Sequence, residues 1–219
     1  MSVSRVKIIA CATVLEEILP LLPQGLTYEV LDFGLHVTPD KLRSRLQAKI
    51  DAASAEVDII ILGYGLCSLA VVCLKATECT LVVPRVEDCI TIFLGSSAVH
   101  KTEARKEPGT YYLTKGWIEV NDTPFTEHAS WVERYGPERA DQMVRLLFKN
   151  YTRLAFIDTG CIDQDRYREY ARSMAKQFGL RYEELAGSTA MISKMLNGPW
   201  DADFVITRPG ETIRYADFR

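Results

Sequence analysis

The sequence lacks the long apolar segments of membrane and exported proteins. Its longest fully apolar runs fall far short of the roughly 20 residues that a membrane span requires. The amino-terminal stretch MSVSRVKIIACATVLEEIL has no uninterrupted apolar core of the signal-peptide kind, since Lys7 is soon followed by Glu16 and Glu17. We therefore expect a cytoplasmic protein with no membrane partner.

An excess of positive charge is also missing. The chain has 26 Lys and Arg against 29 Asp and Glu, which gives a formal net charge of -3 and a pI near 5.7. A nucleic-acid-binding surface needs a clustered basic face, so we expect no nucleic-acid partner. The content of 47% hydrophobic and 25% charged residues is that of an ordinary globular protein.

The sequence signatures of familiar catalytic machinery are absent as well. No nucleophile elbow, Walker loop or HExxH zinc motif occurs. The only histidines are His36, His100 and His128, and none has a partner at the i, i+4 spacing of metal-binding helices. We therefore expect each histidine to lie on the surface.

What the sequence does contain is a regular alternation of strand and helix patterns. Amphipathic stretches predict helices between short apolar runs, and these runs predict strands at residues 5–11, 28–34, 57–62, 79–84, 153–158, 180–185 and 204–206. Such alternation indicates a parallel sheet with helices on both faces. We predict an α/β protein with a doubly wound, Rossmann-like and mainly parallel sheet. Because no low-complexity linker divides the chain, we expect residues 1–219 to form a single domain.

Residues 98–131 break this alternation. The stretch PGTYYLTKGWIEVNDTPF holds turn signals with short aromatic segments between them, which predicts a hairpin or a lid-like excursion. Loops of this length in compact domains are usually functional. Tyr111, Tyr112 and Trp117 would either cover a crevice and exclude water, or pack on the rim of the sheet.

Cysteine is well represented, although no C-x-x-C spacing occurs. The six cysteines are Cys11, Cys67, Cys73, Cys79, Cys89 and Cys161. Reducing compartments keep thiols free, so structural disulfides are not expected. Cys73, in a helix predicted at about 66–76, and Cys79, at the start of a strand, are assigned to apolar packing.

Three other cysteines stand where predicted strands end. Cys11 closes the first strand, Cys67 lies just beyond the third, and Cys89 follows the fourth by five residues. In a parallel sheet of order 2-1-3-4 these ends share one edge, where ligands bind. Adjacent strands are about 4.8 Å apart, so the three thiols would reach one volume. Three thiolates with a vacant position are typical of a reactive metal or iron–sulfur site, and Cys161 is an optional fourth ligand. Separate apolar packing of each cysteine is the alternative.

Two further features favour thiolate chemistry at this edge. Cys67 and Cys89 fall in the first turn of predicted helices, where the helix dipole lowers the pKa of a thiol. Gly63 and Gly65 allow the backbone to approach a bound cofactor and to donate N–H groups to it. Together with Ser68, these glycines also resemble a dinucleotide fingerprint, but its last glycine is missing and it follows the third strand rather than the first.

Two charged residues are candidates for catalysis at the same edge. Arg85 follows the fourth strand and would bind an anionic substrate, or would form an ion pair with Glu87 or Asp88. Asp158 ends the fifth strand and would position a proton, or would cap the turn at Thr159.

Five blocks, IIACATVLEE, LGYGLCS, PRVEDCITIFLGS, PGTYYLTKGWIE and IDTG, make the chain resemble an uncharacterised family called domain of unknown function 1638. The resemblance is collinear over nearly all of the chain. It implies that Cys11, Cys67 and Cys89 are the family's recurring cysteines, that Cys161 stands outside the family pattern, and that Glu87 occupies a position where many members carry histidine. Members often occur beside corrinoid-dependent methyltransferases and the proteins that reactivate corrinoids, which implies a role in one-carbon metabolism.

We therefore expect an iron–sulfur cluster as first choice, or zinc as second, in an enzyme or accessory protein of corrinoid-dependent methyl transfer. The partner would be a small-molecule substrate or a corrinoid protein, and a corrinoid is a further candidate cofactor. One alternative is a carrier or sensor without turnover, which needs its site near the surface, whereas a catalyst should be closed over. The other alternative is a thiol–disulfide enzyme that uses a pair such as Cys67 and Cys89.

Overall fold

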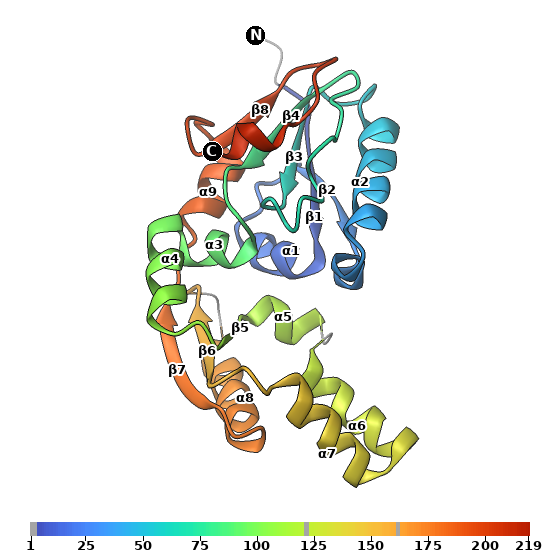
Figure 1. The fold of residues 1–219 in the computed structure, drawn as a ribbon. Coiled ribbons are helices and arrows are strands. Elements are labelled where there is room, and N and C mark those ends of the chain that lie inside the picture. Colours follow the sequence, from blue (N-terminus) through green and yellow to red (C-terminus); the bar gives the residue numbers. More distant parts are fainter. Residues whose placement is uncertain (1–3, 121–122, 161–162) are drawn as a thin grey trace.

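The structure, a computed structural model, describes residues 4–120, 123–160 and 163–219. These residues form two β-sheets with helices around them, arranged in two lobes (Figure 1). The strands are β1 (Val6–Cys11), β2 (Thr27–Leu31), β3 (Ile59–Gly63), β4 (Thr80–Pro84), β5 (Thr110–Leu113), β6 (Arg153–Asp158), β7 (Arg181–Ala186) and β8 (Phe204–Thr207). The helices are α1 (Ala12–Ile18), α2 (Pro39–Ala53), α3 (Cys89–Leu94), α4 (Ser97–Lys106), α5 (Lys115–Val120), α6 (Pro124–Tyr135), α7 (Pro137–Leu147), α8 (Gln164–Gln177) and α9 (Ala190–Asn197), with short 3-10 helices at Leu19–Leu21, Phe33–Val37 and Tyr215–Phe218.

The first sheet has five strands in the order β2-β1-β3-β4-β8. The first four strands along the chain run parallel, and β8 pairs with β4 antiparallel. The described strands thus have the order 2-1-3-4, which is the condition under which the three cysteines share one edge. Across the centre of the sheet Ile8 lies opposite Ile61, which lies opposite Val82, and all three are fully buried. These strands are apolar because helices cover both of their faces.

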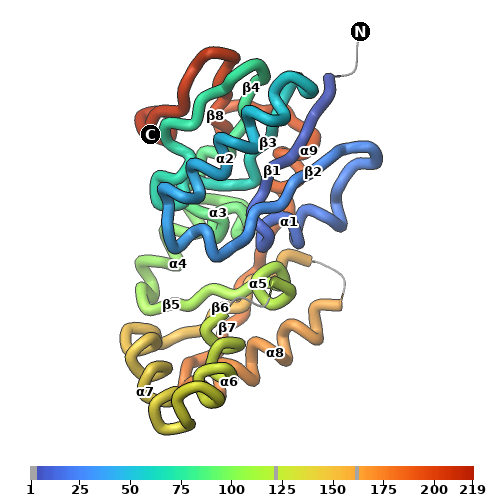
Figure 2. The backbone as a smooth tube through the Cα atoms, turned by 90° about the vertical axis from the view of Figure 1, so that its right-hand side faces the viewer, coloured from blue at the N-terminus to red at the C-terminus, as the bar shows by residue number. Residues whose placement is uncertain are grey.

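Helix α2 shows how such a face is covered. It begins at Pro39, and Leu42, Leu46 and Ile50 are fully buried at helical spacing, as the sequence pattern predicts. α2 lies along one face of the first sheet and α9 lies on the opposite side (Figures 1 and 2).

A second, smaller sheet has the order β5-β6-β7, and all of its strands are parallel. The fold is thus α/β, with a mostly parallel sheet and a separate parallel sheet. The sequence pattern had predicted a single sheet. The hairpin predicted at 98–131 does not form, since most of the described residues there belong to α4, β5, α5 and α6, and β5 pairs with β6. The lid-like excursion stays a prediction. The strand β5 is short and aromatic, and it is stabilised as a strand by pairing with β6 about 40 residues later, a non-local contact that local patterns do not show.

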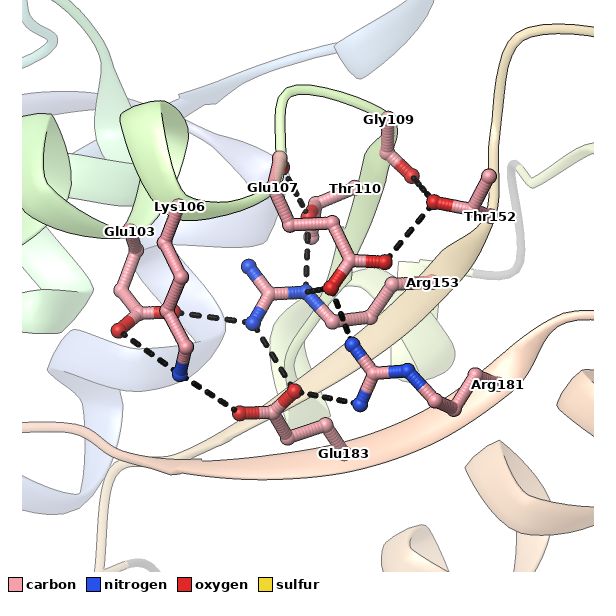
Figure 3. A network of polar contacts seen from close by, with 9 residues as sticks. All are labelled: Glu103, Lys106, Glu107, Gly109, Thr110, Thr152, Arg153, Arg181 and Glu183. Atoms are coloured by element: carbon pink, nitrogen blue, oxygen red, sulfur yellow. Dashed lines mark hydrogen bonds and ion pairs between the residues drawn. The ribbon is translucent and has the colours of Figure 1, made fainter.

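Arg153 ties the second sheet to α4 (Figure 3). Its side chain is fully buried, and its Nη1 lies 2.9 Å from a carboxylate oxygen of Glu103 and 3.1 Å from one of Glu183. Its Nε donates a hydrogen bond to Thr110 Oγ1 at 2.8 Å. One buried cation on β6 therefore contacts α4, β5 and β7, and the carboxylates neutralise its charge.

The carboxyl ends of both sheets face each other across the boundary between the lobes. Glu17 on α1, which follows β1, accepts hydrogen bonds from the Gly116 N–H at 2.9 Å and from the Thr159 hydroxyl at 2.6 Å. Ser188, which follows β7, donates its N–H to the carbonyl of Phe93 on α3 at 2.8 Å. Helices α1, α3 and α5 therefore lie between the two sheets (Figure 1).

The buried apolar side chains of both lobes form one continuous cluster. This shared cluster does not decide whether residues 1–219 form a single domain, so that expectation stays a prediction. No helix within the described ranges combines the length and the apolar character that a membrane crossing demands.

Candidate functional site

The three candidate ligands lie on the edge that faces the second lobe. Cys11 is the last residue of β1 and is 1% exposed, and Cys67 follows β3 and is 9% exposed. Cys89 is the first residue of α3, after β4, and is partly buried. We call these three side chains the thiol site.

Backbone hydrogen bonds hold two members of the thiol site side by side. The N–H of Leu66 donates to the carbonyl of Val86 at 2.8 Å, and the N–H of Cys67 donates to the carbonyl of Glu87 at 3.0 Å. The loop after β3 thus runs along the loop after β4. Cys67 and Cys89, far apart in sequence, are neighbours because of this pairing.

The two glycines permit the close packing behind the thiol site. A Cβ atom on Gly63 would lie 2.6 Å from the Cβ of Ala10 on β1, and a Cβ on Gly65 would lie 2.8 Å from the backbone nitrogen of Asp88. Both glycines thus face protein atoms, so they are needed for packing, whatever the site binds. Their role as cofactor-binding residues stays a prediction.

Electrostatic interactions link the three thiols. Burial raises the pKa of Cys11, it raises the pKa of Cys67 to about 12, and it raises the pKa of Cys89 well above its ordinary value. The charge of Cys11 raises the pKa of Cys67 further, and the charges of Cys67 and Cys11 do the same for Cys89. The predicted lowering of the pKa by helix ends is therefore wrong for the metal-free protein, because desolvation dominates.

A helix at 66–76 does not form, and this also alters the setting of Cys67. The residues after β3 make turns, and Cys67, Ser68 and Leu69 have φ of 43°, 56° and 69°. Three successive left-handed residues are incompatible with a right-handed helix. Such strain is typical of segments held in place by their surroundings, here by the hydrogen bond to Glu87.

The thiols have neutral hydrogen-bond partners. The Sγ of Cys11 lies 2.8 Å from the Oγ1 of Thr13 on α1. The backbone of Gly65 forms a hydrogen bond with Cys67 that lowers its pKa slightly against the effect of burial. As the side chains lie, no three His, Cys, Asp or Glu residues of the described ranges form a group that could hold a metal ion. Ligation would need the thiols to turn about χ1.

Aromatic rings form a wall beside the thiol site. Tyr64 is 1% exposed, and this burial raises its pKa, which the charges of all three cysteines raise further. Its ring stacks on His36 at 5.9 Å, and the ring of Phe33 lies 5.2 Å from His36 and 6.1 Å from Trp117. Trp117 packs edge-on against Phe93 of α3 at 5.6 Å. We call these five residues the aromatic wall.

Sequence reasoning missed most of this wall. The expectation of a surface position is wrong for His36, whose pKa is lowered by burial. Of the three aromatic residues singled out in 98–131, Trp117 reaches the wall, whereas Tyr111 packs on Phe125 and Phe148 in the second lobe. Tyr64 could have been found from its place in the GYGLC block, directly between two glycines needed for packing.

A small polar cluster follows from Asp88, the residue that precedes Cys89. The carboxylate of Asp88 caps α3 by accepting from the N–H of Thr91 at 3.2 Å, and the Nδ1 of His100 lies 2.8 Å from the Oγ1 of Thr91. The side chain of His100 is 14% exposed and its ring packs on Tyr112, so its predicted surface position is wrong. His128 is likewise partly buried, beside Asp141.

Arg85 does not join the thiol site. Its backbone N–H donates to the carbonyl of Asp203, and its Nη2 lies 3.4 Å from the carbonyl of Phe204. The residue lines a surface hollow with Arg214 and Asp217 instead. The ion pair with Glu87 or Asp88, the alternative weighed from sequence, does not form either, since Glu87 pairs with Lys101 at 3.6 Å.

Asp158 ends β6 and lies at the carboxyl edge of the second sheet. It was predicted at the same sheet edge as the cysteines, which lie on the first sheet. Its carboxylate accepts from the N–H of Gly160 at 2.9 Å and pairs with Arg168. The first contact is the turn cap that was its structural alternative. Asp158 lines a surface hollow together with Thr159 and Ser188. Its predicted role in positioning a proton stays a prediction.

The remaining cysteines are placed differently from one another. Cys79 is 1% exposed, as expected from apolar packing. Cys73 is exposed and has a φ of 70°, so its assignment to a buried helix is wrong. Cys161, the optional fourth ligand, lies outside the described residues.

A larger hollow in the described surface is remote from the thiol site. It is lined by Arg5, Lys7 and Trp200 and lies where β1 begins, at the amino ends of the strands. Its walls carry none of the cysteines, so we do not assign it to the same function.

Comparison with known proteins places the chain in a family. The family model described as Protein of unknown function (DUF1638) matches residues 30–196, about three quarters of the sequence. The chain belongs to this family. Within the DUF1638 match lie Cys67, Cys89 and the whole pairing of the two loops, whereas Cys11 precedes it. No curated protein and no solved structure matches the chain.

Proposed function

We propose that this DUF1638 protein binds an iron–sulfur cluster, or zinc as second choice, through Cys11, Cys67 and Cys89. The observation that carries the proposal is the position of three thiols, two of them buried and Cys89 partly buried, beyond the carboxyl ends of three neighbouring strands, where their charges influence one another's pKa. Soft thiolate ligands select zinc and iron–sulfur clusters. The group would supply a Lewis acid or redox centre with one position open to substrate.

The fold around the thiols supports a ligand at this edge. We interpret the first sheet, with order 2-1-3-4 and helices on both faces, as a doubly wound, Rossmann-like unit. In such units ligands bind outside the carboxyl ends of the strands, where the strand order reverses. Here that reversal lies between β1 and β3, the strands that precede Cys11 and Cys67.

The enclosure of the site supports an enzyme over a surface carrier. Cys11 is almost fully buried, and the aromatic wall includes Trp117 from the second lobe's α5, which is 8% exposed. A site enclosed by two lobes can exclude water from a reactive centre. We place the reaction in corrinoid-dependent methyl transfer, on the strength of the family resemblance alone, with a small-molecule substrate or a corrinoid protein as partner.

The experiment is anaerobic purification followed by iron, zinc and sulfide analysis. The native chain should hold stoichiometric metal, Cys67→Ser should lose it, and Cys73→Ser should retain it because that thiol is exposed and is not one of the proposed ligands. Addition of methylcobalamin to the loaded protein then tests the corrinoid assignment through its absorption spectrum. A native chain that cannot be loaded with iron and sulfide or with zinc would refute the metal site, and would leave the thiol–disulfide enzyme as the candidate.

A further inference from the structure

The hydroxyl of Tyr64 is buried without a hydrogen-bond partner among the described residues. The residue follows β3 and is 1% exposed. Folding removes a buried hydroxyl from water, and this is unfavourable unless a partner replaces the water. A buried hydroxyl in this condition needs a partner from outside the protein, either an ordered water or a bound ligand.

Tyr64 is also held in one place. Its backbone lies between Gly63 and Gly65, neither of which can accommodate a side chain without contact below 3.0 Å with neighbouring residues. Its ring stacks on His36 at an interplanar angle of 24°, and His36 is fixed in turn by its Nδ1, 2.9 Å from the carbonyl of Phe33. The hydroxyl cannot easily turn to another acceptor, because the ring has little freedom.

The surroundings of the hydroxyl point to the thiol site. The two glycines that flank Tyr64 pack against the residues that precede two of the thiols, since an added Cβ on Gly63 would lie 2.6 Å from the Cβ of Ala10, before Cys11, and one on Gly65 would lie 2.8 Å from the nitrogen of Asp88, before Cys89. Tyr64 also interacts electrostatically with all three cysteines. Protonated thiols are weak hydrogen-bond acceptors, whereas a thiolate or an inorganic sulfide is an anion that accepts well. A cysteine that ligates a metal does so as a thiolate, so a good acceptor is present at this place when the site is loaded.

We propose that the Tyr64 hydroxyl donates a hydrogen bond to an anionic sulfur of the loaded thiol site, either a cysteine thiolate or a sulfide of the cluster. This inference rests on the proposed function and adds a positioning residue to it. Hydrogen bonds to the sulfurs stabilise the more negative state of a cluster and so raise its reduction potential. Tyr64 therefore tunes the affinity and the potential of the bound group.

The test is Tyr64→Phe, with Tyr28→Phe as matched control, since Tyr28 loses the same hydroxyl from an exposed position on β2. In the metal-free state Tyr64→Phe should be at least as stable to urea as the native chain, because it removes an unpaired buried group. After loading, its affinity for zinc, measured by competition with a chelator, should fall about tenfold. The reduction potential of the protein reconstituted with iron and sulfide should fall as well. Tyr28→Phe should match the native chain in all three.

The outcomes separate the inference from the function beneath it. Loss of stability by metal-free Tyr64→Phe would show that the hydroxyl already has a structural partner and would overturn the inference. Unchanged zinc affinity and unchanged potential in Tyr64→Phe, with normal loading of the native chain, would also overturn it while leaving the metal site intact. A native chain that takes up neither zinc nor a cluster would refute both the proposed metal-binding function and the inference on Tyr64.

Discussion

The backbone N–H of Cys67 donates a hydrogen bond to the carbonyl of Glu87, 3.0 Å away, and this bond joins the loops that carry two of the three thiols. Main-chain contacts set the distance between the two loops, so substitution of a side chain at this site leaves that distance unchanged. The thiol site is therefore most vulnerable where those contacts are tightest.

Gly65→Ala should disrupt the thiol site without touching a thiol. The new Cβ would lie 2.8 Å from the nitrogen of Asp88 and 2.9 Å from the carbonyl oxygen of Val86, so the loops must separate. We expect a loss of about 1–3 kcal/mol in the free energy of unfolding and loss of metal, measured by urea titration and metal analysis.

Gly25→Ala is the control for this substitution. Gly25 has a φ of 86° and no atom within 4 Å of an added Cβ, so alanine there should cost only about 1–2 kcal/mol of backbone strain and leave metal content unchanged. Full metal content in a folded Gly65→Ala protein would contradict the role given to the loop pairing.

Metal uptake should release protons and should tighten as the pH rises. Burial raises the pKa of Cys11, Cys67 and Cys89, so all three thiols are protonated near pH 7 and must lose their protons to become ligands. Calorimetric zinc titrations in buffers of different ionisation enthalpy should show about three protons released per metal. Release of fewer than one proton near pH 7 would mean that the thiols are already ionised.

The metal-free protein should lose stability at alkaline pH. The folded-state pKa of Cys67 is about 12, whereas an unfolded cysteine titrates near about 8.5, so above that pH the unfolded chain binds fewer protons than the folded one. Each such thiol should then lower the free energy of unfolding by about 1.4 kcal/mol per pH unit. Urea midpoints measured across this range should fall less steeply for Cys67→Ala, and Cys73→Ala, which changes an exposed thiol, should follow the native chain.

Much of the first sheet could be predicted from the sequence because its signals are local. Continuous apolar runs such as that of β3 mark strands buried on both faces, and the helical spacing of Leu42, Leu46 and Ile50 marks α2. The position of cysteines after strands, together with the order 2-1-3-4, also brought Cys11, Cys67 and Cys89 to one edge. These conclusions need only periodicity and the parallel rule.

What could not be predicted depends on contacts between distant segments. The strand β5 exists through its pairing with β6, and the left-handed turn at Cys67 through hydrogen bonds to the loop after β4. The local sequence also does not determine where a long side chain points. The Arg85 side chain points toward β8 and not toward the thiols. The raised pKa values of the thiols arise from burial, which depends on how distant segments pack and which local patterns do not show.

Arg153→Met tests whether the charge network of the second sheet stabilises it. The substitution keeps an apolar stem of similar length but leaves the carboxylates of Glu103 and Glu183, which are 16% and 24% exposed, without the guanidinium between them. Removal of one partner from a buried ion pair lowers the free energy of unfolding by about 3–5 kcal/mol. Because both glutamates are partly exposed, we expect a loss of about 3 kcal/mol. Arg181→Met, which changes a side chain that is 54% exposed, should cost clearly less, and equal losses in the two variants would contradict a special role for burial.

Acid unfolding gives this network a second, independent readout. Hydrogen bonds from Arg181 and then Arg153 lower the pKa of Glu183 to about 2, below the value of about 4.3 expected in the unfolded chain. The stability due to this carboxylate is therefore complete above about pH 4.3 and is lost as the pH falls toward 2. In Arg153→Met the pKa of Glu183 should rise, so urea midpoints should fall less between these pH values than in the native chain. A native and a variant protein with the same acid dependence would show that Arg153 fills space in the second sheet without stabilising the charge of Glu183.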